Sequence, residues 1–145
     1  MIWNTIPNEE RLRLWKKLRE DIKDLPVKEQ LDNVAKFCST MPYGSRTIDY
    51  YSPEEWPSPW DILFHGDFCT SSISLLMHYT LTLLPSEKKL ELVLVEDDDG
   101  VFLLPIIDDQ FVLNYQLGQV SMYSEIQNDI TVLQRYQEQE IKKIA

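Results

Sequence analysis

The chain has few of the residues that mark a fibrous, low-complexity or disulfide-stapled protein. Its 145 residues include four glycines and eight prolines, and Cys38 and Cys69 are the two cysteines. This composition excludes a collagen-like or wholly disordered chain, and two cysteines at this length do not make a disulfide framework. We therefore expect one domain with its own hydrophobic core, in a reducing compartment.

Long apolar runs are also missing. The longest apolar-rich stretch, 73–84, has only twelve residues and contains several polar side chains, whereas a membrane-spanning helix needs about 20. The first residues lack the basic segment and the continuous apolar segment of a secretory signal. We expect no membrane association and a location in the cytoplasm, or inside a particle assembled there.

Basic residues are scarce in the middle of the chain. Residues 1–46 hold nine Lys and Arg against seven Asp and Glu, residues 47–134 hold two against fifteen, and residues 135–145 hold three against two. An acidic body of this kind repels nucleic-acid phosphates and anionic lipid, so we predict no direct binding of DNA, RNA or a membrane surface. Two kinds of partner stay open. One is a protein with a basic surface, and the other is a DNA-binding protein that would bind this acidic chain as a mimic of DNA.

Hydrophobic periodicity indicates helices first and strands later. We predict helices over about 8–25, 27–41, 58–64 and 69–84, then strands over 90–95, 101–107 and 111–115, a short strand after Gly118 and a polar helix from about Glu125 to the end. Pro105 indicates an edge or a bulge in the middle strand. The predicted fold class is α+β, in which N-terminal helices and a central helix that begins near Cys69 pack on a small antiparallel sheet of three to four strands, with a C-terminal helix at its edge.

Two surfaces are candidates for binding. The first helix has a basic face that is either solvated or docks on an acidic partner, and it comprises Arg11, Arg13, Lys16, Lys17 and Arg19. The loop over 42–60 is dense in proline and aromatic residues, and its aromatic side chains either pin the loop by packing or line a groove for a peptide or glycan. The aromatic candidates are Tyr50, Tyr51, Trp56 and Trp60.

Two acidic clusters invite a metal hypothesis that their spacing does not support. The runs at 96–99 and 108–109 lack the alternating ligands of a calcium loop, and both coincide with turn signals. We predict turns at these positions, and we predict neither a metal site nor a cofactor.

Cys69 is the best candidate for a nucleophile. A thiol at the start of a helix lies at the positive end of the helix dipole, which favours the reactive thiolate. His65 is four residues away and is the candidate base. His78 follows Cys69 by nine residues, which places it on the opposite helix face and roughly 13 Å along the axis, so we interpret it as a packed histidine. Cys38 is interpreted as a core residue.

The order of these features resembles that of a known family. The segment Trp-Pro-Ser-Pro-Trp-Asp-Ile-Leu-Phe-His-Gly-Asp-Phe-Cys over 56–69, the apolar helix after it and the strand Phe-Val-Leu-Asn-Tyr over 111–115 resemble the bacterial transglutaminase-like cysteine proteinases. The resemblance covers about 31–120, which implies one domain with an N-terminal helical extension over 1–30, a transglutaminase-like core and a C-terminal helix over 121–145. The tryptophan-rich segment is also similar to short proteins of tailed phages, which implies the host cytoplasm or the virion as the location.

The departures from the family pattern concern its catalytic residues. One extra residue precedes Cys69, and Thr70 and Ser71 stand where the family has acidic residues. The family's histidine position falls within 101–103, which holds no histidine, and Asn114 stands at the position of the aspartate. An Asn without a His to orient has no catalytic role. The resemblance therefore implies that Cys69, His65 and Asn114 form a site only if His65 replaces the missing base.

The sequence thus predicts a non-catalytic, transglutaminase-like protein that binds another protein, either as a phage virion component or as a binder of a host factor. The basic helix, the acidic middle and the C-terminal segment are the expected contact surfaces, and their opposite charges also permit self-assembly. One alternative is an active cysteine peptidase, amidase or acyl transferase that uses Cys69, with Asp67 as another possible orienting residue. Another is an acidic inhibitor that mimics DNA.

Overall fold

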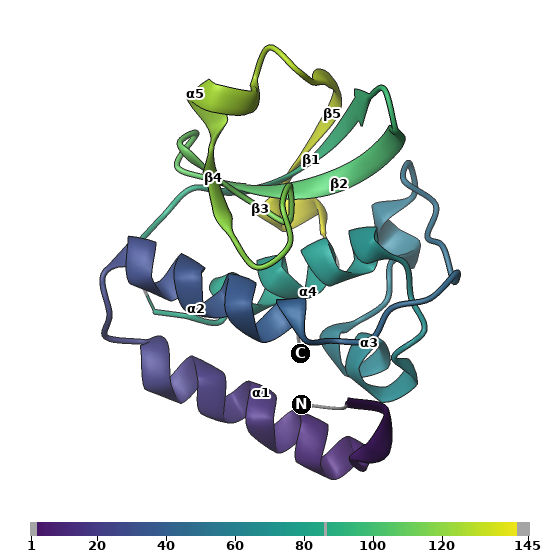
Figure 1. Cartoon of the computed structure of the whole chain (residues 1–145), viewed down its shortest axis with the longest axis vertical. Helices are drawn as coiled ribbons and strands as arrows, with labels where there is room; N and C mark the ends of the chain where they lie inside the picture. The colour runs from purple at the N-terminus through teal and green to yellow at the C-terminus, as the bar shows by residue number, and fades with distance from the viewer. Residues whose placement is uncertain (1–2, 86, 142–145) are drawn as a thin grey trace.

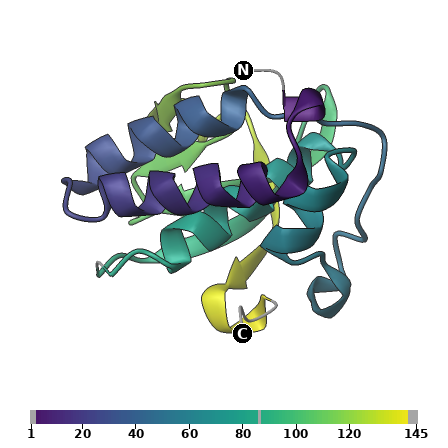
Figure 2. The same cartoon turned by 90° about the horizontal axis from the view of Figure 1, so that it is seen from below.

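The predicted helices of the first half of the chain form a layer against one face of a sheet (Figure 1). The computed structural model describes residues 3–85 and 87–141. The four longer helices are α1 (Asn8–Ile22), α2 (Val27–Ser39), α3 (Pro59–His65) and α4 (Thr70–Thr82). Short 3-10 helices occupy Trp3–Thr5, Pro53–Glu55 and Glu138–Glu140. Figure 2 shows α1 and α2 running side by side along the helical layer. No helix in the described ranges is both long and apolar enough to cross a membrane.

The sheet has five strands, each antiparallel to its neighbours, in the order β4-β3-β2-β1-β5. The strands are β1 (Leu90–Asp97), β2 (Gly100–Ile107), β3 (Phe111–Leu113), β4 (Val120–Met122) and β5 (Thr131–Gln137). The predicted turn between β1 and β2 is confirmed, and Gly100 adopts φ 135° there. β3 pairs only with Ile106 and Ile107 of β2, so Pro105 has no paired strand on that side. Pro105 therefore lies at a local edge of the sheet, where proline is tolerated.

The predicted C-terminal helix is wrong. After β4 the chain forms only the short helix α5 (Tyr123–Ile126) and then returns to the opposite edge of the sheet, where β5 pairs with β1. The i, i+4 spacing of apolar residues predicted a helix, but β5 has the β-branched and aromatic composition of a strand. Tyr136 of β5 is buried and packs its ring against Trp56 at 5.0 Å. This tertiary contact and the pairing with β1 outweigh the weak helical periodicity.

Helix α4 is the centre of the molecule, as predicted from its apolar sequence. Every residue from Ser71 to Leu81 is buried, and the helix packs on β2 and β1. The indole of Trp15 in α1 donates a hydrogen bond of 2.8 Å to the Thr80 hydroxyl, which fixes α1 against α4. Cys38 and His78 are both buried, so their interpretation as packed residues is confirmed.

The other face of the sheet carries a second, smaller core. Val93, Val95, Leu104, Ile106 and Val112 lie there, and Ile126 of α5 covers them. The buried carboxylate of Glu91 in β1 is held at this layer's margin by Arg135 and Gln137 of β5. The segment that joins β4 to β5 therefore covers this face while it carries the chain from one edge to the other.

Candidate functional site

Local sequence fixes the backbone on both sides of Cys69. Ser58 and Asp61 form a capping box at the start of α3, and Gly66 ends that helix with φ 67°. The N–H of Cys69 donates a hydrogen bond of 2.8 Å to the carbonyl of Arg46. Cys69 is thus clamped at the N-cap position of α4, one residue before the first turn in which we expected it.

The Cys69 thiol is half-buried and has one polar neighbour. Its Sγ lies 3.7 Å from the Oγ of Ser72, in the first turn of α4. Within residues 3–85 and 87–141, no hydrogen bond joins the thiol to an imidazole. The helix start therefore presents a cysteine with the Ser72 hydroxyl beside it, and the acid or base that would activate the thiol must come from another element.

The two histidines lie in different surroundings, and neither forms a hydrogen-bonded pair with Cys69. His65 is the last residue of α3, is exposed, and packs edge-on against the rings of Phe64 and Phe68, at 5.0 and 6.1 Å. His78 is 2% exposed, and its Nδ1 has no hydrogen-bond partner in the described structure. Burial lowers the pKa of His78 to about 4, so this imidazole is neutral at physiological pH.

The strand segment at which the family pattern places its histidine does pack beside the start of α4. The N–H of Leu103 donates to the hydroxyl of Ser71 at 3.1 Å, and the hydroxyl of Ser74 donates to the Leu103 carbonyl at 2.7 Å. Side chains alternate along β2, so Val101 and Leu103 face the helices whereas Phe102 faces the second core. The position next to the cysteine helix therefore holds two aliphatic side chains.

Asn114 also meets the start of α4. It follows β3 directly and adopts φ 64°, a left-handed conformation that Asn tolerates better than most residues. Its Nδ2 donates to the carbonyl of Thr70 at 3.0 Å and to the hydroxyl of Ser74 at 2.8 Å. The structure thus brings Asn114 and the first turns of α4 together, and the side-chain amide of Asn114 ties β3 to that helix.

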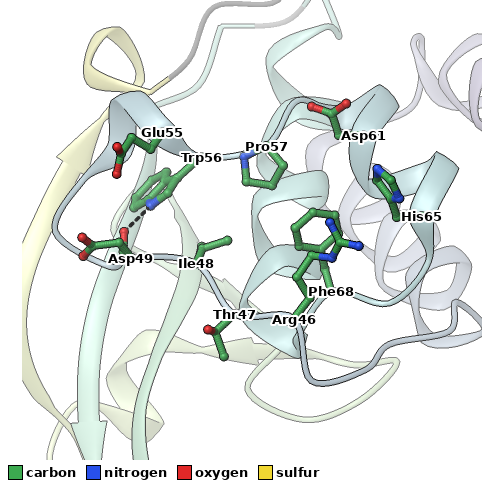
Figure 3. A pocket seen from close by; sticks show the side chains of 10 residues that line it. All are labelled: Arg46, Thr47, Ile48, Asp49, Glu55, Trp56, Pro57, Asp61, His65 and Phe68. Carbon is green, nitrogen blue, oxygen red and sulfur yellow. Dashed lines mark hydrogen bonds between the residues drawn. The ribbon is translucent and has the colours of Figure 1, made fainter.

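A pocket of about 410 Å³ opens beside the Cys69 turn, between the loop over 46–57 and α3 (Figure 3). Of the predicted binding residues, Trp56 lines this pocket, and its indole donates to the carbonyl of Asp49 at 2.7 Å. The lining is mixed in charge and polarity. It comprises Arg46, Thr47, Ile48, Asp49, Glu55, Trp56, Pro57, Asp61, His65 and Phe68.

The other aromatic candidates divide between packing and exposure. The Tyr50 hydroxyl shares a hydrogen bond with Ser71 at 3.2 Å, and the Tyr50 carbonyl accepts from the hydroxyl of Tyr136 at 2.6 Å. Trp60 packs edge-on against Trp15 and is 41% exposed, and Tyr51 is 66% exposed. Packing therefore pins part of the loop, while the rings of Tyr51 and Trp60 reach solvent.

The basic residues of α1 have separate roles. Arg11 donates to the carbonyls of Leu63 at 2.8 Å and Phe64 at 3.2 Å, at the end of α3. Arg13 pairs with Glu10 and Lys17 pairs with Asp21, both on the surface of α1, where Lys16 is also exposed. Arg19 is half-buried, and its guanidinium lies over the Trp15 ring at 4.4 Å. Arg11 therefore joins two helices, Arg19 packs within the helical layer, and Arg13, Lys16 and Lys17 remain on the solvent face.

Sequence reasoning missed the charged residues of the pocket. Arg46 and Asp49 lie in an irregular loop and Glu55 ends the short 3-10 helix Pro53–Glu55, so no periodicity shows which of these side chains lie close together. The density of proline and aromatic residues between 42 and 60 was the one signal that this loop is ordered. Both predicted acidic turns are confirmed, and Asp108 and Asp109 have positive φ values of 55° and 54°.

Comparison with known proteins gives a structural likeness only. No protein-family model matches the sequence, and no curated protein matches it. The calcium-bound structure of LapG from Legionella pneumophila is similar, with a TM-score of 0.74 and 16% identity over 96% of this chain and 84% of that chain. A second LapG structure has a TM-score of 0.75 and 17% identity over 90% of this chain and 76% of that chain. EGTA-treated LapG gives a TM-score of 0.73, 16% identity and coverage of 90% and 77%. LapG is a transglutaminase-like cysteine protease, so this chain has a mixed α+β fold of the transglutaminase-like kind.

Proposed function

We propose that this protein is a catalytically silent, transglutaminase-like domain that acts by binding another protein. The observation that carries the proposal is the pair of aliphatic side chains, Val101 and Leu103, on the β2 segment that packs beside the cysteine helix. A cysteine nucleophile needs a base that takes its proton and returns one to the leaving group. Aliphatic side chains do neither.

Asn114 and His65, the other two candidate catalytic residues, support the same conclusion. Asn114 uses its side-chain N–H groups on Thr70 and Ser74, which gives it a structural role at this point of the fold. His65 packs on Phe64 and Phe68 and lines the neighbouring pocket.

Exposed aromatic rings beside the pocket favour a protein partner. Trp60, Phe64 and Tyr51 are 41%, 59% and 66% exposed. The first two are chain neighbours of the pocket residues Asp61 and His65. Aromatic side chains are enriched in protein interfaces because they bury large areas at a small cost in side-chain entropy. The likeness of the sequence to phage-encoded proteins favours a phage virion protein or a host factor as this partner.

One of the similar LapG structures is calcium-bound, so we looked for a group of side chains that suits a calcium ion in the described residues of this chain. Within residues 3–85 and 87–141, no three His, Cys, Asp or Glu side chains converge to hold a metal ion. Asp67, the acidic residue nearest to Cys69 in the sequence, pairs with Arg46 at 3.0 Å, and Thr70 and Ser71 follow the cysteine. The proposed function therefore includes no metal-dependent step.

The rate of alkylation of Cys69 against pH tests the proposal. The experiment uses a Cys38→Ala background, although burial raises the pKa of the Cys38 thiol to about 12 and keeps it unreactive. We expect alkylation of Cys69 to be slow at neutral pH, and its dependence on pH to be the same after His65→Ala.

Fast alkylation at neutral pH that His65→Ala slows at least tenfold would show a rearranged Cys-His pair and overturn the proposal. Hydrolysis of a peptide or ester substrate that Cys69→Ser abolishes would do the same. Circular dichroism of each variant provides the control that the fold is intact.

A further inference from the structure

Strand β5 forms an open edge of the sheet. It pairs with β1 on one side, and within residues 3–85 and 87–141 no backbone hydrogen bond reaches its other side. The carboxylate of Glu140 accepts a hydrogen bond of 3.0 Å from the N–H of Gln137, which closes the end of the strand. The N–H and C=O groups of 131–135 that point away from β1 therefore have no partner in the described chain.

This edge lacks the residues that usually protect an exposed strand, which are proline and outward-pointing lysine. It is also long, because β5 has seven residues whereas β4, at the opposite edge, has three. Residues 131–134 are uncharged and exposed, and the apolar side chains of Val132 and Leu133 are 36% and 38% exposed. Arg135 donates to the carboxylate of Glu91 at 3.1 Å. The strand thus presents an uncharged, partly apolar edge to solvent.

A bulge at Leu133 limits the length of a strand that pairs with this edge. Leu94 pairs with Gln134 and Val95 pairs with Val132, so Leu133 has no residue opposite it on β1. A bulge bends its strand and increases the local twist. A flat, continuous sheet therefore does not extend from β5, whereas a short segment follows the bend.

The start of β5 lies in an acidic part of the surface. Figure 1 shows it near the turn between β1 and β2, and Thr131 pairs with Glu96 just before that turn. A hollow of about 230 Å³ at this place has no cationic side chain in its lining, which comprises Glu96, Asp97, Asp98, Asn128, Asp129, Ile130 and Thr131. No lysine or arginine occurs between 90 and 134. The negative potential here attracts a basic segment and repels an acidic one.

The same charge argues against a second copy of this chain on the edge. The chain carries a net charge of −10, so two copies repel each other. The one cation of β5 is Arg135, which already pairs with Glu91. A second β5 would therefore bring no free cation to the acidic start of the first.

We propose that a short extended segment of the partner protein, with uncharged β-forming residues followed by lysine or arginine, adds to β5 as an antiparallel strand. Main-chain hydrogen bonds to 131–135 hold the segment, and its side chains contact Val132 and Leu133. Antiparallel pairing places its basic C-terminal end beside Asp129, at the start of β5. The inference rests on the proposed function, because it names the surface and the chemistry by which the silent domain binds its partner.

Short peptides test the edge without knowledge of the partner. The probe is acetyl-Thr-Val-Thr-Val-Thr-Lys-Lys-amide. One control replaces both lysines with glutamate, and the other has every threonine and valine N-methylated, which removes the backbone donors of the segment. Binding is followed by hydrogen exchange of the backbone amides over 131–135. We expect the lysine peptide to slow the exchange of the amides that point away from β1 by about tenfold, and both controls to leave it unchanged.

Two variants locate the effect. Asp129→Asn removes an exposed charge beside the start of β5 without removing volume, and we expect it to weaken binding of the lysine peptide about two- to threefold. Glu20→Gln removes an exposed charge from α1 and is expected to leave the affinity unchanged. Exchange that the lysine peptide does not slow, equal binding of either control peptide, or equal effects of the two variants would overturn the proposal.

Sedimentation and mass spectrometry of the same samples separate the remaining outcomes. A dimer of the free protein in which the amides over 131–135 are protected would show that a second copy covers the edge, and would overturn the proposal. Cleavage of the bound peptide that disappears in Cys69→Ala would contradict the silent-domain proposal and leave the strand edge standing. Absence of binding, with the peptide intact, would overturn the strand-edge proposal alone.

Discussion

Asn114 shows how a candidate catalytic residue can serve the fold. Its side-chain amide donates hydrogen bonds to Thr70 and Ser74, which join the end of β3 to α4. Its backbone adopts a φ of 64°. We predict that Asn114→Ala lowers the free energy of unfolding by about 2 kcal/mol, because the bonds are lost and alanine is strained at this φ. Asn114→Gly relieves the strain and is expected to cost about 1 kcal/mol. Chemical denaturation measures both values.

The same two variants distinguish a structural from a catalytic role. We expect Cys69 to be alkylated at the wild-type rate in each folded variant, because the amide does not orient an imidazole. A slower rate in both variants, with little loss of stability, would assign Asn114 to an active site instead.

His78 predicts a dependence of stability on pH. Burial lowers its pKa from 6.5 to about 4, so the unfolded chain binds a proton more readily than the folded chain between these values. Stability is therefore fully present above pH 6.5 and falls as the pH drops toward 4, by about 3 kcal/mol from this residue. His78→Leu removes the titrating group from the buried site and should flatten this part of the profile.

Denaturation of the wild type and His78→Leu at several pH values from 4 to 8 measures the difference. Carboxylates contribute equally to both proteins, so the difference between the two profiles isolates His78. Parallel profiles would show that the imidazole reaches solvent when protonated.

At the scale of elements, Arg11 connects α1 to the end of α3. Its guanidinium donates to the carbonyls of Leu63 and Phe64, which have no further turn of helix to accept from. We predict that Arg11→Ala lowers the free energy of unfolding by about 1–2 kcal/mol, whereas Lys16→Ala, an exposed change on the same helix, stays within about 0.5 kcal/mol. Thermal and chemical denaturation measure these effects.

Equal stability of the two variants would show that the hydrogen bonds from Arg11 to α3 contribute nothing to stability, as for a solvent-facing side chain. The sequence placed both residues on one basic face, because helical periodicity describes the helix alone. It does not show that the carbonyls of α3 lie against Arg11.

The elements that the sequence predicted well are those with strong local signals. The capping box at Ser58, the all-round apolar α4 and the hairpin before Gly100 each depend on residues close in sequence. The strand β5 depends on contacts with β1 and Trp56, so its own weak periodicity misled the prediction. The pocket has the same origin, because its loop and α3 meet only in the folded chain.

At the scale of the whole molecule, β5 joins the end of the described chain to its centre. It pairs with β1 along that strand, and the hydroxyl of Tyr136 donates to the carbonyl of Tyr50 in the pocket loop. Residues 31–120 therefore lack β5, most of β4 and the ring that packs on Trp56.

We predict that a chain ending at residue 128 does not fold to a stable monomer. Without β5, the buried residues Leu92 and Leu94 of β1 lose their paired neighbours, and the exposed strand edge favours aggregation. Leu133→Thr, a change at a half-exposed position within β5, is the matched control and is expected to leave the fold intact. Sedimentation and circular dichroism compare the proteins. A truncated chain that stays monomeric, with a cooperative thermal transition, would show that the helical layer and four strands suffice, and that β5 serves the pocket loop alone.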